Sequence, residues 1–136
     1  MHGTAPALAA VRLTLHVLAA AIWVGGQIVM TGLVGPTRRM GQDATQALAR
    51  AFARMAWPAY LVLIATGFWN ISTFHFSSQT SAWKAVLMAK IVIVVAAGVG
   101  AFLHQRASTR ATLALWGSVA GVASIAALAM GVVLAG

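Results

Sequence analysis

The sequence predicts an all-α integral membrane protein, a single bundle of four transmembrane helices. Of its 136 residues, 61% are hydrophobic and only 7% are charged, and the mean hydropathy is +0.90, far above that of a soluble domain. The apolar residues also form four runs long enough to cross a hydrocarbon core, at about 10–34, 55–73, 84–104 and 112–135. Because lipid offers the backbone no hydrogen bonds, each run is expected to be a helix.

The length of the chain allows one domain, residues 1–136, with brief loops and no separate soluble part. The first apolar run, from Leu13 to Val34, is too long for the core of a cleaved signal peptide and is expected to stay as a helix. Gly35 and Pro36 follow it as a stop signal. The next segment is rich in Ala, so the second helix is expected to begin before it enters the membrane.

Positive charge is concentrated at two of the predicted connections. The net charge of +8 comes from nine Lys and Arg against one acid, Asp43. In a membrane protein such residues set topology and meet lipid headgroups, so the bilayer is the expected partner and nucleic acid is not. The first and third connections carry six of them: Arg38, Arg39, Arg50, Arg54, Arg106 and Arg110. By the positive-inside rule, both termini face away from the cytoplasm.

Polar and polarisable side chains form one stripe on the first predicted helix. His16, Ala20, Trp23, Gln27 and Met30 follow one another at steps of four and three. This stripe is expected to face the interior of the bundle. An intramembrane histidine is more often functional than not, and the alternative is a packing histidine that donates to a backbone carbonyl.

The third predicted helix carries a lysine inside its apolar run. Lys90 follows Trp83 and precedes His104 on one stripe, and an unpaired ammonium at this depth should find a partner, meet water or lose its proton. The predicted topology places Lys90 and His16 at similar depth in the outer leaflet. Trp57, Trp69, Trp83 and Trp116 lie near helix ends, as expected of interface anchors.

The chain has no cysteine, so a metal site would use His, Met, Asn or Asp ligands. The predicted topology allows an outward-facing cluster of His16, Lys90, His75, Asn70 and Met88. His75 and His104 also fit an ordinary solvated role. The other methionines form no closely spaced array and are expected to pack.

Three stretches resemble the CopD (copper resistance D) family of membrane domains over nearly the whole chain. They are LHVLAAAIWVGGQIVM, FARMAWPAYLVLIATGF and MAKIVIVVAAGVGAFLHQR. The resemblance implies a multi-pass protein of the bacterial cytoplasmic (inner) membrane that handles copper by binding or transmembrane transfer, with a periplasmic copper-binding partner. Its metal ligands would be His16, helped by His75 and Met88, which suit Cu(I) or Cu(II).

The chain also resembles the HemJ-type protoporphyrinogen oxidases of the same broader group, in its WPA and TG pieces and in the third-helix Lys and His. This alternative implies a haem b protein in which His16 is an axial ligand, Lys90 or an Arg pairs with a propionate, and Trp23 completes the cofactor-binding set. Room for the macrocycle would come from Gly25, Gly26, Gly98 and Gly100. The chain has GPTRRMGQ where the HemJ pattern has P-R-L-x-V-Y-H, and it lacks N-E-V-P in helix four.

No hydrolytic motif is present in the sequence, neither a Ser-His-Asp set nor paired carboxylates nor a phosphate loop. The chain is therefore not expected to be an enzyme, and if it is one, a haem-dependent oxidoreductase is the expected class. A third alternative is a structural or accessory membrane subunit whose polar stripe fixes helix packing. The G-x-x-x-G spacing of Gly117 and Gly121 would serve the bundle itself or a homodimer.

Overall fold

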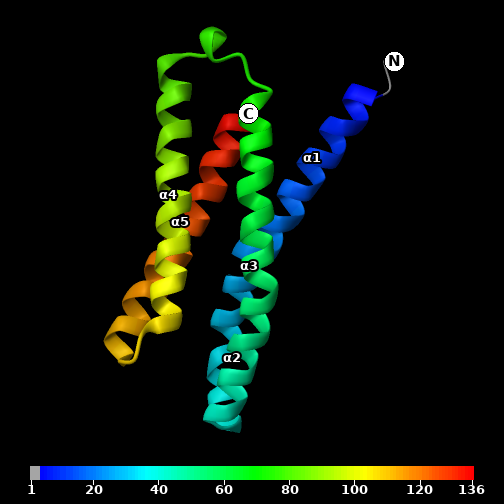
Figure 1. Cartoon of the computed structure of the whole chain (residues 1–136). Coiled ribbons are helices and arrows are strands. Elements are labelled where there is room, and N and C mark those ends of the chain that lie inside the picture. Colours follow the sequence, from blue (N-terminus) through cyan, green and yellow to red (C-terminus); the bar gives the residue numbers. More distant parts are fainter. Residues whose placement is uncertain (1–3) are drawn as a thin grey trace. The chain divides into compact units, whose positions relative to one another are not determined.

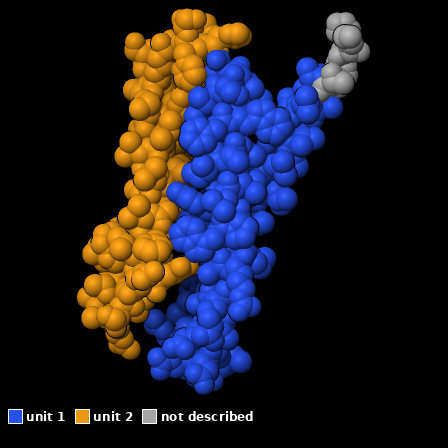
Figure 2. Space-filling model, viewed as in Figure 1, with its two compact units in different colours: residues 1–74 blue, residues 75–136 orange. Residues whose placement is uncertain are grey.

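The computed structural model describes residues 4–136, and every regular element in this range is helical (Figure 1). The chain divides into two compact units, residues 1–74 and residues 75–136 (Figure 2). His2 lies outside the described residues. The prediction of an all-helical chain is confirmed.

Unit 1 contains one long helix and a second that runs back beside it. The first comprises α1 (Thr4–Ala20), a π-helical turn η1 (Ala21–Gly25) and α2 (Gly26–Met40), without a break between them. The second is α3 (Gln42–Ser72). It begins well before the apolar run at about residue 55, as the Ala-rich sequence predicts.

The first helix ends at Met40, so the stop predicted at Gly35 and Pro36 is wrong. Pro36 lies inside α2, and the helix continues to Met40. A proline has no backbone N–H, so Pro36 cannot bond the carbonyl of Gly32, and a transmembrane helix tolerates the loss of one such bond. The hydroxyl of Thr37 donates to the next carbonyl along the helix, that of Leu33, at 2.8 Å. Gly41 has φ of +119°, a conformation that side chains disfavour, and there the chain reverses into α3.

Unit 2 is a helical hairpin of α4 (Ser81–Arg106) and α5 (Arg110–Ala135), preceded by the short 3₁₀ turn η2 (Phe76–Ser78). Each long helix begins at a threonine cap. The Thr80 hydroxyl accepts from the Trp83 backbone N–H, and Thr109 forms a reciprocal capping box with Thr112. With these caps, α4 begins three residues and α5 begins two residues before its predicted apolar run.

Small residues let the two helices of unit 2 approach closely. Ala97, Ala120 and Ser124 are almost fully buried. A Cβ added to Gly100 would lie 3.0 Å from a methyl group of Val119 and 3.1 Å from the backbone nitrogen of Ala120. Close contact between small residues is the usual way that transmembrane helices associate.

Four described helices are long and apolar enough to cross a membrane: Ala5–Met40, Gln42–Ser72, Ser81–Arg106 and Arg110–Ala135. Their outward faces are apolar, since Val17, Phe68 and Val122 are 65%, 68% and 69% exposed. Apolar side chains this exposed are stable against lipid and costly against water. The chain is therefore a multi-pass membrane protein.

Candidate functional site

The polar stripe of the first helix faces α3. His16, Ala20, Trp23, Gln27 and Met30 are all buried or half-buried, while neighbouring residues on the other side of the helix are exposed. The stripe lies within unit 1, whose two long helices run antiparallel (Figure 1). The spacing of the stripe thus predicted the face that packs.

A hydrogen bond joins His16 on α1 to Thr66 on α3. The imidazole Nδ1 lies 2.7 Å from the Thr66 hydroxyl oxygen, and Thr66 is only 4% exposed. The next residue, Gly67, has no side chain, and a Cβ there would lie 4.0 Å from the His16 Cε1 atom. The Nδ1–Cε1 edge of the imidazole therefore lies against a Thr-Gly step of α3.

The geometry of Thr66 determines which nitrogen of His16 carries the proton. The Thr66 hydroxyl has one proton and donates it to the carbonyl of Val62 at 2.7 Å. The hydroxyl oxygen is then an acceptor toward the imidazole, so the Nδ1–H of His16 is the donor. In a neutral imidazole with its proton on Nδ1, the Nε2 atom carries the lone pair. This is the tautomer in which a histidine binds a metal through Nε2.

Below His16, the helix is interrupted by a π-helical turn around a buried tryptophan. Trp23 is 4% exposed, and its ring lies 4.7 Å from that of Tyr60 and 5.4 Å from that of Trp57. The Gln27 side chain donates to the Trp23 carbonyl at 3.0 Å, inside the π turn. Single π turns are frequent at functional sites because they redirect side chains without ending the helix. Trp57 was expected only to anchor the interface, and it is also part of this aromatic cluster.

Lys90 lies in unit 2, half-buried against α5. A Cβ added to Gly131 would lie 3.0 Å from the ammonium nitrogen of Lys90, so the absent side chain makes room for the charge. Gly131 was not singled out in the sequence. The predicted pairing of Lys90 with His16 joins the two units and stays a prediction.

The other predicted metal ligands are also in unit 2. His75 caps the η2 turn and is exposed, and Met88 on α4 is 61% exposed. Within residues 4–136, no group of three His, Cys, Asp or Glu residues is close enough to hold a metal ion. The predicted copper site combines His16 of unit 1 with these two residues of unit 2 and stays a prediction.

His104 has a structural role at the other end of unit 2. Its Nδ1–H donates to the carbonyl of Leu113 at 2.8 Å, near the start of α5. Gly117 provides the space, because a Cβ there would lie 3.1 Å from the imidazole. Of the G-x-x-x-G pair, Gly117 therefore serves packing within the hairpin. A Cβ at Gly121 would meet open space.

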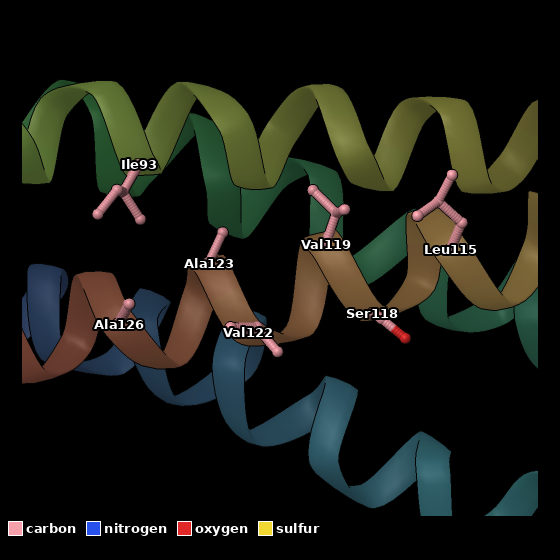
Figure 3. A pocket seen from close by; sticks show the side chains of 7 residues that line it. All are labelled: Ile93, Leu115, Ser118, Val119, Val122, Ala123 and Ala126. Atoms are coloured by element: carbon pink, nitrogen blue, oxygen red, sulfur yellow. The ribbon is translucent and has the colours of Figure 1, made fainter.

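A shallow pocket of about 480 Å³ lies on the surface of the hairpin (Figure 3). Ile93 of α4 and six residues of α5 line it: Leu115, Ser118, Val119, Val122, Ala123 and Ala126. No ionisable or metal-binding side chain is among them. The pocket is therefore an apolar groove and not a site of chemistry.

No protein-family model, curated protein or solved structure matches this chain. The candidate site therefore rests on the geometry around His16. The sequence pattern predicted His16 and missed its partner Thr66. The signal was present in the apolar second helix as a hydroxyl followed by a glycine, at the depth that an antiparallel partner of His16 would occupy.

Proposed function

We propose that this membrane protein handles copper, by binding it or transferring it across the bilayer, with the Nε2 atom of His16 as the principal ligand. The observation that carries the proposal is the hydrogen bond from His16 Nδ1 to Thr66. Metal-binding histidines nearly always donate their other ring nitrogen in this way, which fixes the tautomer and orients the ring. The resemblance to CopD domains agrees with this function.

In the full site, soft or borderline ligands from unit 2 complete the coordination of copper. Met88 offers a thioether and His75 a second imidazole, and both suit Cu(I) or Cu(II). Lys90 does not bind the metal as an ammonium and instead adjusts the local charge. This arrangement requires the two units to pack as one four-helix bundle, with both termini outside the cytoplasm. The membrane is the bacterial inner membrane, where a periplasmic copper-binding protein would be the exchange partner.

Copper retention by detergent-purified protein tests the proposal. The wild-type chain should keep copper through dialysis, and His16→Ala should lose it. His104→Ala is the matched control, because that imidazole is also hydrogen-bonded but lies at the far end of α4. Equal retention by wild type and by a variant lacking His16, His75 and Met88 would show that these side chains are not the ligands.

The same imidazole also favours a second candidate function, a haem b protein. An axial histidine likewise binds iron through one nitrogen and donates from the other. Two of the glycines expected to make room for the macrocycle do not do so. The Phe52 ring occupies the space beside Gly26, and α5 occupies the space beside Gly100. Gly25 does meet open space. A Soret band in the purified protein that disappears in His16→Ala would favour haem over copper.

A further inference from the structure

The π-helical turn η1 places one extra residue inside the first helix. A single π turn amounts to an α-helix with one added residue, and here the helix continues on both sides of it. If a regular α-helix absorbed that residue, α1 would move along its axis by about 1.5 Å and rotate by about 100°. With α2 fixed, each residue of α1 would then take the place now held by the residue before it. The first helix therefore has two registers available against α3.

The packed positions of α1 are filled by similar residues in both registers. Within residues 5–20, the buried or half-buried positions are Ala9, Arg12, His16, Ala19 and Ala20. In the second register each is replaced by the next residue in sequence, which gives Ala10, Leu13, Val17, Ala20 and Ala21. Three of the five positions keep an alanine, so a shift by one residue preserves the size of the side chains at most of the contacts with α3.

The position beside Thr66 changes its chemistry. In the second register Val17, now 65% exposed, takes the place of His16. His16 turns to the side of the helix now held by Leu15, which is 41% exposed, and Arg12 turns outward with it. The imidazole then loses its hydrogen bond to the Thr66 hydroxyl and meets a more apolar environment. Both changes are costly, so the register with His16 against Thr66 is the more stable of the two.

Few buried contacts hold α1 in either register. Within residues 5–20 only Ala19 is buried, at 3% exposed. Toward its N-terminal end α1 diverges from α3, so the packing becomes sparser along the helix (Figure 1). A segment with so few buried contacts rearranges at a lower free-energy cost than a packed core helix.

We propose that the π turn is a register switch, through which α1 exchanges between a register with His16 against Thr66 and one with Val17 in that place. The hydrogen bond to Thr66 holds the first register. The second register presents the imidazole on the face of α1 that now carries Leu15. The exchange gives an intramembrane histidine two different surroundings without unfolding the helix. It does not depend on what His16 binds, so it is tested apart from the proposed function.

Cysteine crosslinking in lipid nanodiscs tests the exchange, because the chain has no cysteine of its own. Gly67→Cys supplies the thiol on α3, where an added Cβ makes only an ordinary contact with His16, 4.0 Å from Cε1. The second thiol is placed at Val17 or, as the matched control, at Leu18, which are 65% and 56% exposed. With a short bifunctional thiol reagent, we expect Val17→Cys to crosslink to Gly67→Cys. Leu18→Cys should not, because residue 18 faces α3 in neither register.

Two further changes shift the registers in opposite directions. Thr66→Val removes the acceptor of His16 and should increase crosslinking from Val17→Cys about fivefold, the population shift that follows from losing one hydrogen bond. Deletion of Ala21 removes the extra residue and leaves only the register with His16 against Thr66. Crosslinking from Val17→Cys should then fall to the level of the Leu18→Cys control, while His16→Cys should crosslink efficiently.

Three outcomes would overturn the proposal. Equal crosslinking from Val17→Cys and Leu18→Cys in the undeleted chain would indicate a single register. Crosslinking from Val17→Cys that persists after deletion of Ala21 would assign it to general mobility of α1. Failure of His16→Cys to crosslink in the deletion variant would show that the π turn does not hold the extra residue.

Discussion

His16 on α1 donates a hydrogen bond from Nδ1 to the hydroxyl of Thr66 on α3, across a distance of 2.7 Å and 50 residues of sequence. The bond connects the two long helices of unit 1 and determines which imidazole nitrogen is a base. One contact thus contributes both to packing and to the chemistry of the candidate site.

Replacing Thr66 with valine should separate these two contributions. Valine keeps the shape of the side chain and removes the acceptor, so the free energy of unfolding should fall by about 1–3 kcal/mol. If His16 binds copper, affinity should also fall about 10- to 100-fold, as it does when such supporting partners are removed. Unfolding in mixed micelles and copper titration measure the two effects. Thr66→Ser keeps the hydroxyl and should behave as wild type, and an equal loss in both variants would mean that the hydrogen bond is irrelevant.

Adjacent glycines provide a matched pair in the first helix. A Cβ at Gly26 would collide with the ring of Phe52, whereas a Cβ at Gly25 would meet nothing within 4 Å. Gly26→Ala should therefore destabilise unit 1 by about 1–3 kcal/mol. Gly25→Ala should be neutral or stabilising by up to about 1 kcal/mol, because alanine favours helix. Thermal unfolding compares them, and a second change, Phe52→Leu, should recover part of the loss in Gly26→Ala.

A similar contrast exists in unit 2. Gly100 lies against the backbone of α5, and Gly121 has open space where a side chain would be. We expect Gly100→Ala to destabilise the hairpin by about 1–3 kcal/mol. Gly121→Ala should leave the hairpin unchanged, and unfolding in mixed micelles measures both. If Gly121→Ala instead weakens self-association of the chain, measured by crosslinking in lipid, Gly121 belongs to the interface of a homodimer.

The π turn depends on the side chain of Gln27. Because Gln27→Leu removes the donor to the Trp23 carbonyl, local opening should cost about 1 kcal/mol less. Amide hydrogen exchange within residues 23–27 should then accelerate about fivefold. Thr31→Val is the control, since it removes an exposed hydroxyl that bonds the carbonyl of Gln27. Equal acceleration in both variants would contradict a particular role for the glutamine.

Part of the candidate site was predictable because it depends on periodicity along one helix. The steps of four and three from His16 to Met30 identified the packed face, since the positions of side chains around a helix follow from its pitch alone. The partner of His16 was not predictable in this way. The register between α1 and α3 depends on how side chains such as Trp23, Phe52 and Tyr60 interlock, and that information is spread over both helices.

The end of the first helix is a second feature that local sequence signals alone did not predict. Gly35 and Pro36 are strong stop signals in water, where a broken helix can bond to solvent. In a transmembrane helix the backbone has no such alternative, so the helix continues to Met40.

The sequence by itself determined that the chain is helical, that four helices can span a membrane, and which face of the first helix is packed. These properties follow from local composition and helical pitch. Only the tertiary structure decided that His16 donates to Thr66 and that the space beside Gly26 holds the ring of Phe52. The reason is physical: each depends on a distance between atoms far apart in sequence, and packing sets that distance.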